Sequence, residues 1–456
     1  MPKDVQDLIC KNIYKKKVSQ FLKRKTWKLY YEKKRVQYLD RNEIRDIQLD
    51  KLKILLKMAE NSSYYKKYID ALNKPIDNIT FKDLKKFPIL TKEIIREKKH
   101  DLIVKDIKYL FPNASGGSTG EPVHFYQDQH YRDNIWASMM IINEMCGWYY
   151  GARYARLWGA LQDKNAFNKK SNLFWQNTRF YNTFDMSENK LEEYHADMSL
   201  FQPEIIISYA SSMYLLAKFL KSKGIKPNYP KISIVTTSEP LYPHMRETIE
   251  SVFRVKCFNR YGGREISAIA CECEAHNGLH IMMDNVIIEC LDPQTGEEVF
   301  DSPGEIVVTD LNNHGMPFIR YRIGDVGIIS KERCKCGRNT LRFKQIIGRN
   351  TEHFTMQNGR IIHGCFFALK LLGLEGIKAF QFIQDSLSKF TLSIVKTDTF
   401  DNLGFDNAIN EIKKVIGQDS VLETKFIQSV ATTPTGKYRY VSSKVNPENI
   451  WTLKKS

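Results

Sequence analysis

The most informative part of the sequence is the stretch Ser115-Gly116-Gly117-Ser118-Thr119-Gly120-Glu121-Pro122. Its glycines let the backbone turn sharply and bring successive N–H groups close to an anion, and its hydroxyl groups add further donors. No Gly-Lys-[Ser/Thr] follows, so the loop is not a Walker loop. The next residues, Pro122 to Tyr126, predict a strand and not a long helix. Taken alone, the loop fits a Gly/Ser hairpin without a ligand as well as it fits a phosphate site.

The chain beyond this loop predicts an α/β core followed by a more antiparallel region. Apolar residues recur at helical spacing from Asn134 to Met145 and from Ser211 to Lys223. Short β-branched runs, Ile205 to Ser208 and Ile232 to Val235, alternate with these helices, which is typical of parallel strands in an α/β sheet. After Asp284, turn signals separate runs that predict antiparallel strands.

Bulk properties narrow the class of protein. A chain of 456 residues exceeds a single typical domain, and 42% hydrophobic and 12% aromatic residues are ample for a packed core. No run approaches the ~18 apolar residues that cross a bilayer, and the first residues lack the apolar run of a signal peptide. The 9 cysteines, several in Cys-x-Cys pairs, suit a reducing compartment better than a disulfide scaffold. These features predict a cytoplasmic protein.

The formal net charge of +17 has three interpretations, and much of the excess lies in Lys11 to Lys17 and Phe21 to Lys25. A solvated helical surface in a Lys-rich chain explains it best. Peripheral membrane contact through this basic N-terminus comes second, because the segment that follows mixes lysines with Trp27 and Tyr30. Nucleic acid comes third, since no binding module is recognisable and none specific is expected. The oligomeric state, a homodimer included, stays open.

Three further segments carry residues that a nucleotide site would use. Tyr261 to Ser267 holds Glu265, and Tyr321 to Val326 places Asp325 after a glycine turn at a predicted strand start, where ribose-type hydroxyls could be accepted. Near the C-terminus, Lys437 follows a turn of Thr and Gly. Individually, these are most simply a turn with a satisfied carboxylate, a capping aspartate and a surface lysine.

The cysteines and one histidine suggest a metal site. Cys273, His280, Cys334 and Cys336 would make a closed Cys₃His tetrahedron, as expected of structural zinc. Cys271 could replace Cys273, because both precede His280 at a plausible reach. A set of reduced, buried thiols is the alternative.

The co-occurrence and order of these segments resemble the adenylate-forming superfamily of acyl-CoA synthetases, and in particular the phenylacetate–coenzyme A ligase family with its capsular-polysaccharide (CapK-like) branch. The resemblance covers nearly the whole chain. Asn61 to Tyr65 resembles the family's Asn-Ser-Pro-Phe-Tyr, Phe87 to Lys92 resembles its Leu-Pro-x-x-Thr-Lys, and Ser115 to Pro122 matches its phosphate-binding loop residue for residue. Family members also carry a Cys-x₆-His and a Cys-x-Cys-Gly-Arg, which favours zinc.

This resemblance implies a fold and two domains. The fold is α/β, with a large N-terminal adenylate-forming domain (α/β sheets plus a β subdomain) over residues 1–349, helical and basic at its N-terminus. A small, mobile C-terminal α/β domain would follow over residues 350–456.

The resemblance also implies a role for each matching residue. The residues that would hold the β- and γ-phosphates of ATP are Ser115, Gly116, Gly117, Ser118, Thr119 and Gly120. The residues of the adenine pocket would be Ser238, Glu239, Pro240 and Tyr261, with the Tyr261 ring stacked on the adenine, and Gly262 would also contact the nucleotide. Glu265 would ligate Mg²⁺, Asp325 would accept the ribose hydroxyls, and Arg349 would lie at the domain boundary. Lys437 would bridge the carboxylate and the α-phosphate.

These roles imply an AMP-forming acid–thiol ligase that activates a carboxylic acid with ATP and then transfers the acyl group to coenzyme A. A carboxylate is a poor nucleophile toward an anionic phosphate, so catalysis depends on charge neutralisation and in-line positioning. One alternative keeps the adenylation step but transfers the acyl or aminoacyl group to a non-CoA acceptor, such as a sugar amine in cell-surface polysaccharide assembly. The alternative from another class is a basic, zinc-stabilised nucleic-acid-binding protein.

Three departures from the family pattern matter. Asn350-Thr351-Glu352 follows Arg349 where a pair of acidic residues is usual, which affects the hinge. Cys365-Phe366-Phe367-Ala368 replaces Asn-x-Phe-Pro, which weakens the case for coenzyme A. Tyr154 to Ala160 replaces a Gly-rich stretch that would line the acyl pocket, with Trp158 and Tyr209 as candidate lining residues, so phenylacetate is not assumed as the substrate.

Overall fold

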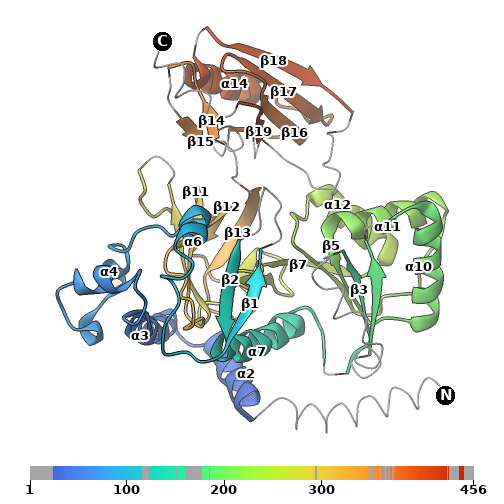
Figure 1. The fold of residues 1–456 in the computed structure, drawn as a ribbon. Helices are drawn as coiled ribbons and strands as arrows, with labels where there is room; N and C mark the ends of the chain where they lie inside the picture. The colour runs from blue at the N-terminus through green and yellow to red at the C-terminus, as the bar shows by residue number, and fades with distance from the viewer. Residues whose placement is uncertain are drawn as a thin grey trace.

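The computed structural model describes residues 24–115, 123–149, 151–159, 177–183, 185–292, 295–349, 353–358, 361–363, 367, 370–371, 374–417, 419–428, 430 and 441–445. They form a large body that ends with a long strand at Arg349 and a smaller body drawn in red (Figure 1). A continuous sheet of 11 strands, in the order β10-β11-β12-β13-β9-β8-β7-β6-β5-β3-β4, runs through the large body.

One half of this sheet is parallel. Its strands are β3 (Tyr154–Trp158), β4 (Thr178–Asn182), β5 (Ile205–Tyr209), β6 (Ser233–Thr237) and β7 (Lys256–Tyr261). The helices α10 (Glu188–Phe201), α11 (Ala210–Ser222) and α12 (Pro243–Phe253) lie on one face (Figure 1). Alternate strand residues, such as Leu157, Ile206 and Ile234, pack against them in one apolar cluster. The parallel strands predicted from the β-branched runs are confirmed.

The other half of the sheet is antiparallel. Its strands are β8 (Ala270–Glu272), β9 (Leu279–Ile281), β10 (Val286–Leu291), β11 (Pro303–Asp310), β12 (Tyr321–Ser330) and β13 (Arg342–Arg349). Asp325 does not follow a turn at a strand start, as its sequence context suggested, but lies inside β12. Gly324, with φ +86°, allows a bulge there, because the three residues Ile323 to Asp325 of β12 lie opposite the single residue Ile306 of β11.

Helices before the sheet cover its antiparallel half. They are α2 (Arg24–Val36), α3 (Arg41–Ala59), α4 (Lys66–Asp70), the 3₁₀ helix η1 (Ile76–Asn78), α5 (Phe81–Leu84) and α6 (Lys92–Glu97). A capping box of Asp40 and Glu43 starts α3, whose face of Ile44, Leu52 and Leu55 is fully buried. A two-stranded hairpin of β1 (Leu110–Ala114) and β2 (His124–Asp128) follows and leads into α7 (Gln129–Met145).

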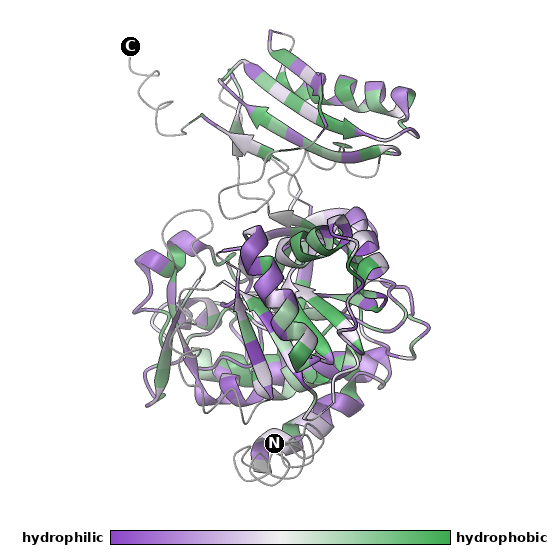
Figure 2. Cartoon of the chain, turned by 90° about the vertical axis from the view of Figure 1, so that its right-hand side faces the viewer, coloured by the Kyte–Doolittle hydropathy of each residue, from purple (hydrophilic) through white to green (hydrophobic). Residues whose placement is uncertain are grey.

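The smaller body has its own sheet, in the order β18-β17-β16-β19. Its elements are β14 (His353–Thr355), β15 (Ile361–His363), β16 (Ile377–Gln384), β17 (Lys389–Lys396), α14 (Asn402–Ile416), β18 (Val421–Phe426) and β19 (Val441–Ser443). The apolar cluster here uses only residues 354–441, Phe382, Phe390 and Ile412 among them. The amphipathic α14 alternates hydrophilic and hydrophobic residues (Figure 2). Together the two bodies confirm the expected α/β class and layout.

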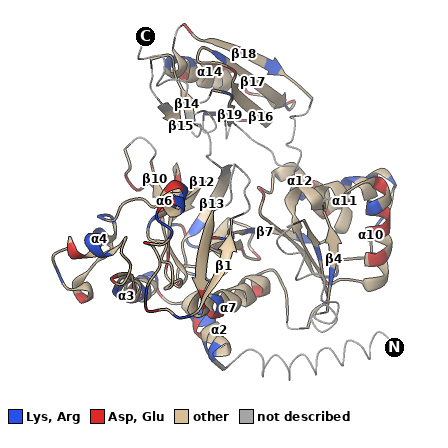
Figure 3. Ribbon diagram, viewed as in Figure 1, with Lys and Arg blue, Asp and Glu red and all other residues tan. Residues whose placement is uncertain are grey.

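Charged residues on the described helices occur in mixed groups. On α4, α6 and α10, lysines and arginines lie beside acidic residues (Figure 3), with ion pairs such as Lys66–Asp70 and Lys190–Glu193. The lysine-rich segment Lys11 to Lys17 lies outside the described residues. No helix of the described part of the chain is long and apolar enough to cross a membrane.

Candidate nucleotide site and zinc centre

The adenine segment expected from the sequence lies where two neighbouring parallel strands end. Thr237 of β6 is in register with Arg260 of β7, so Ser238 and Tyr261 follow side by side at what we call the carboxyl edge of the sheet. Ser238 has a left-handed backbone (φ +68°), which turns the chain off the strand. The Glu239 carboxylate accepts a hydrogen bond of 2.9 Å from the backbone N–H of Ser211 in α11. Open parallel sheets bind ligands at this edge.

Tyr261 and Asp325, expected at the adenine and the ribose, meet in the structure. The Tyr261 hydroxyl donates a hydrogen bond of 2.7 Å to Asp325 Oδ2, across 64 positions of sequence. Asp325 is also the register partner of Arg349 on β13, which brings the backbone of the predicted boundary residue to the same place. The side chain of Arg349 is outside the described set. Phe343 packs edge-on against the Tyr261 ring, with centroids 5.6 Å apart.

Glu265 lies in a tight turn directly after β7. The backbone N–H of Gly263 donates to the Ile266 carbonyl (2.8 Å), and a Cβ on Gly262 would come within 3.0 Å of the Ala268 nitrogen, so this turn requires glycine. Glu265 is 6% exposed, and its Oε1 accepts a long hydrogen bond of 3.4 Å from Tyr321. No described lysine or arginine pairs with it. A buried carboxylate without a basic partner fits a cation such as Mg²⁺.

The β1–β2 hairpin, which flanks the predicted phosphate loop in the sequence, contacts this turn. Gln127 of β2 donates through Nε2 to the Arg264 carbonyl (3.2 Å). Ser115 is the one residue of the predicted phosphate group that the structure describes. Its N–H donates to the Val123 carbonyl (2.9 Å), and its hydroxyl accepts from the Val123 N–H (2.8 Å), so it closes the base of the loop. Gly116 to Gly120, and Lys437, lie outside the described residues.

The four expected zinc ligands come together. The ligand atoms of Cys273, His280, Cys334 and Cys336 all lie within 4.8 Å of one another. The Cys273 and Cys334 sulfurs are 3.7 Å apart, and Cys336 Sγ is 3.3 Å from His280 Nε2. Edges of this length match a tetrahedron with Zn–S bonds of about 2.3 Å and a Zn–N bond of about 2.0 Å. These residues therefore fit structural zinc.

Surrounding groups prepare His280 as a neutral ligand. Its Nδ1 is 2.9 Å from the Thr340 hydroxyl, which orients Nε2 toward Cys336. Burial, assisted by Arg338 and Arg342, lowers the pKa of His280 to about 3. Cys271, the alternative ligand, points elsewhere, with its sulfur 3.5 Å from that of Cys146. Residues two apart in a strand face the same side, but Cys273 lies just after the end of β8, where this alternation no longer applies.

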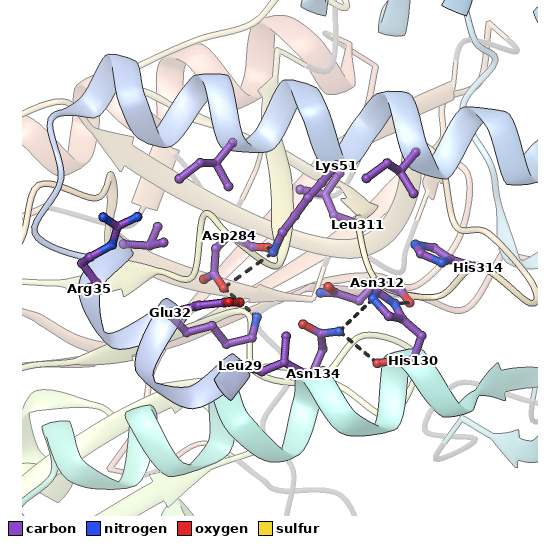
Figure 4. Close-up of a pocket in the computed structure, with 14 residues that line it drawn as sticks. Leu29, Glu32, Arg35, Lys51, His130, Asn134, Asp284, Leu311, Asn312 and His314 are labelled. Atoms are coloured by element: carbon purple, nitrogen blue, oxygen red, sulfur yellow. Dashed lines mark hydrogen bonds and ion pairs between the residues drawn. The ribbon is translucent and has the colours of Figure 1, made fainter. Parts of the chain in front are cut away.

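A cavity of about 350 Å³ lies between α2, α3 and α7 (Figure 4). Lys33 donates to Asp284 Oδ2 (2.6 Å) and to Asn285 Oδ1 (2.7 Å), and Lys51 donates to the Asp284 carbonyl (2.7 Å). Burial and the neighbouring Lys33 lower the pKa of Lys51 to about 8. The His130 ring stacks on a second histidine at 4.3 Å. Nothing in the sequence pointed to this cavity, because its lining comes from four separated segments.

Comparison with known proteins places the chain in a class. In fold it is similar to 2-hydroxyisobutyryl-CoA ligase in the postadenylation state in complex with R3-HIB-AMP, with a TM-score of 0.65 and 17% identity over 92% of this chain and 93% of that one. The same ligase in the thioesterification state gives a TM-score of 0.60 over 92% and 94%, at 18% identity. The fold is thus that of the adenylate-forming ligases.

Sequence relatives are more specific. Residues 354–444 match the family model of the CapK C-terminal domain. Protein CapK of Staphylococcus aureus is 23% identical over 440 residues, which cover 93% of this chain and 94% of CapK. Phenylacetate–coenzyme A ligase of Aromatoleum evansii is 28% identical over 335 residues, 70% of this chain and 73% of the ligase. The expected resemblance to the phenylacetate–coenzyme A ligase family and its CapK-like branch is confirmed.

Proposed function

We propose that this protein activates a carboxylic acid with ATP and Mg²⁺, forming an acyl-adenylate and releasing pyrophosphate. The observation that carries the proposal is the 2.7 Å hydrogen bond between Tyr261 and Asp325 at the carboxyl edge, beside Ser238 and four residues before the buried Glu265 in the chain. These residues come from segments spread over nearly ninety positions of sequence, and their convergence at the carboxyl edge supports a nucleotide site there. The ligase relatives in sequence and fold support the same chemistry.

Each residue has a physical task in this proposal. Glu265 holds the cation that neutralises the triphosphate, Asp325 accepts the ribose hydroxyls, and Tyr261 both faces the base and fixes Asp325. The loop Ser115 to Gly120 binds the leaving pyrophosphate through backbone N–H groups. Lys437, carried by the small domain of residues 350–456, supplies positive charge between the acid and the α-phosphate, so this domain closes over the large one for the first step.

For the second step we favour transfer to coenzyme A, which makes the protein an acyl-CoA synthetase in type. The support is the set of CoA ligases among the relatives. Two observations argue against coenzyme A. The segment Cys365 to Ala368 departs from the family pattern, and the name of the relative CapK does not specify an acyl acceptor. The second candidate is therefore transfer to a non-CoA acceptor, such as a sugar amine. The relatives give no support to nucleic-acid binding.

ATP–pyrophosphate exchange with a panel of aryl, fatty, amino and hydroxy acids tests the first step. At least one acid should give exchange that depends on Mg²⁺. A folded protein that binds ATP but gives no exchange with a broad panel would contradict the proposal. Once the acid is known, mass spectrometry of products formed with and without coenzyme A distinguishes the two acceptors.

We also propose that Cys273, His280, Cys334 and Cys336 bind one structural zinc ion. The support is the compact set of ligand atoms and the orienting contact of Thr340. All four ligand positions are protein side chains, so the ion would have no open position for substrate. Its task is to hold the β8–β9 turn to the β12–β13 turn.

A further inference from the structure

The cavity between α2, α3 and α7 combines charged, polar and apolar side chains (Figure 4). Its volume of about 350 Å³ falls within the range of small-molecule sites, about 300–1,000 Å³. The apolar part of its wall consists of Leu29, Val36, Ile47, Ile54 and Leu311. The other lining residues carry charges or hydrogen-bonding groups, so the cavity suits a small polar ligand.

Positive charge exceeds negative charge in the lining. The lining holds three basic residues, Lys33, Arg35 and Lys51, and two acidic residues, Glu32 and Asp284. Lys33 and Asp284 form a buried pair at 2.6 Å, and Glu32 pairs with the exposed Lys28 at 3.8 Å. Lys51 approaches the Asp284 carboxylate only to 4.0 Å, and the exposed Arg35 has no ion pair with a described residue. The uncompensated charge therefore lies on Lys51 and Arg35.

Lys51 is the charge that a ligand would meet inside the cavity. Its ammonium group donates to the Asp284 carbonyl (2.7 Å), and its other two N–H groups have no hydrogen bond to a described residue. Burial and the neighbouring Lys33 lower its pKa to about 8, so the group is still mostly protonated at pH 7. Asp310, which does not line the cavity, is only about half ionised at that pH, because burial raises its pKa to about 7. An anion beside Lys51 would offset the cost of burying its charge.

The lining also offers acceptors that lack a donor. Asn312 is 1% exposed, and its Nδ2 donates to Asn285 Oδ1 (3.2 Å), which fixes the orientation of the amide. Asn312 Oδ1 is buried and accepts no hydrogen bond from a described residue. The His314 ring stacks on that of His130, and burial lowers the pKa of His314 to about 4, so its neutral imidazole has an acceptor nitrogen. Buried acceptors are normally paired, and a hydroxyl group would supply the missing donor.

The cavity is separate from the candidate nucleotide site. None of its lining residues belongs to the carboxyl edge. Asn312 follows the end of β11 at Asp310, whereas Asp325 lies opposite Ile306, four residues earlier in β11. At about 3.3 Å per residue, the two positions are about 13 Å apart along the strand.

We propose that this cavity is a second ligand site, which binds a small hydroxylated anion, a phosphate or carboxylate that also carries hydroxyl groups. The anionic group lies against Lys51 and Arg35, and the hydroxyl groups donate to Asn312 Oδ1 and to the His314 ring. Glycerol phosphates, sugar phosphates and hydroxy acids share this chemistry. The inference goes beyond the proposed function, since none of these residues has a task in adenylation.

The test separates the charge from the hydroxyl groups. Binding of sn-glycerol 3-phosphate, glucose 1-phosphate and glycerate to the full-length protein is measured by calorimetry at pH 7, without ATP. Glycerol has the hydroxyl groups without the charge, and sulfate has the charge without a hydroxyl group. At least one hydroxylated anion should bind about tenfold or more tightly than both. The phosphate and glycerate arms show which anionic group is recognised.

Two variants assign the binding to the cavity. Lys51→Met should lose about tenfold or more in affinity for the hydroxylated anion, whereas Lys57→Met, on the same helix and paired with Asp77 at 2.7 Å, should bind as the wild type does. His314→Phe keeps the ring stack but removes the acceptor, so it should weaken the hydroxylated anion and leave sulfate unchanged. The hydroxylated anion should raise the melting temperature of the wild type and Lys57→Met but not that of Lys51→Met.

Several results would overturn the inference. They are no binding by any of the three hydroxylated anions, equal binding of glycerol or sulfate, unchanged affinity in Lys51→Met, or displacement by ATP, which would place the anion in the nucleotide site. If Lys51→Met does not fold, His314→Phe decides. Binding that depends on Lys51 in a protein without pyrophosphate exchange would uphold this inference and contradict the proposed adenylation. Exchange without such binding would do the reverse.

Discussion

At the scale of single residues, buried charges in this protein are paired where they hold the fold and left available where a ligand would act. Lys33 and Asp284 are each 3% exposed and lie 2.6 Å apart, so α2 is fixed to the turn before β10. Glu265 is also buried, with 6% of its surface exposed, but has no described basic partner. The first arrangement is explained by stability alone, whereas the second agrees with the proposed Mg²⁺ site.

Replacing Lys33 by methionine should destabilise the protein. Asp284 would keep its burial and lose its closest counter charge, because Lys51 lies at 4.0 Å from the same oxygen. We expect a loss of about 3 kcal/mol in the free energy of unfolding, in the range for breaking a buried ion pair. Urea denaturation measures it, with Lys28→Met on the exposed side of α2 as control. A change no larger than that of the control would contradict this interpretation.

Lys51 should give the stability a specific pH dependence. Its folded pKa of about 8 lies below its ordinary value of 10.5, so folding disfavours the charged form. The resulting destabilisation is fully present below pH 8 and disappears as the pH rises toward 10.5, since only the unfolded chain binds the proton in that window. The unfolding free energy of the wild type, measured relative to that of Lys51→Met, should therefore rise between pH 8 and pH 10. Parallel curves would show that Lys51 is not desolvated.

Glu265→Gln should remove most of the adenylation activity without unfolding the protein. The amide keeps the size of the side chain and can still meet Tyr321, but it binds Mg²⁺ weakly. We expect exchange to fall by about 100-fold, with a higher Mg²⁺ concentration needed for half-maximal rate. Glu193→Gln on the exposed face of α10 is the control. An unchanged Mg²⁺ dependence would assign Glu265 a purely structural task.

At the scale of elements, the local pattern predicted strands and helices well but not their long-range contacts. The β-branched runs of β5 and β6 indicated buried parallel strands, because a strand buried on both faces is apolar at nearly every position. The bulge at Asp325 could not be predicted, since a glycine such as Gly324 is compatible both with a turn that reverses the chain and with a strand that continues. The bond from Gln127 to Arg264, and the cavity beside Lys33, depend on packing between distant segments and could not be predicted.

The zinc proposal belongs to this scale, because the ion would join two hairpin turns. Cys273→Ser should lose zinc and about 2–4 kcal/mol of stability, since metal binding contributes directly to folding. Cys271→Ser should keep one zinc per chain, because its sulfur faces Cys146 and not the other ligands. Elemental analysis and thermal unfolding of the two variants provide a direct comparison. Zinc loss in Cys271→Ser with retention in Cys273→Ser would reverse the assignment.

At the scale of the whole molecule, the two bodies have separate apolar cores, and the long strand β13 ends between them at Arg349. Separate cores allow the smaller body to turn without repacking either one. Arg349 is in register with Asp325, so a movement of the chain after β13 would start directly beside the candidate ribose site. Both bodies could be predicted from the order of strands and helices that the sequence indicates, but the register between Asp325 and Arg349 could not.

Replacing Lys437 tests whether the smaller body contributes to adenylation but not to thioester formation. Lys437→Ala should lower ATP–pyrophosphate exchange by about 100-fold or more, because the variant lacks the positive charge at the α-phosphate. Thioester formation from coenzyme A and a chemically prepared acyl-adenylate should change by less than about fivefold, since that step no longer involves pyrophosphate. Lys444→Ala is the matched control, as Lys444 follows β19 and pairs with Asp385 at 2.6 Å. Equal loss in both half-reactions would show that Lys437 acts on folding or domain docking, whereas full exchange activity would remove it from the adenylation site.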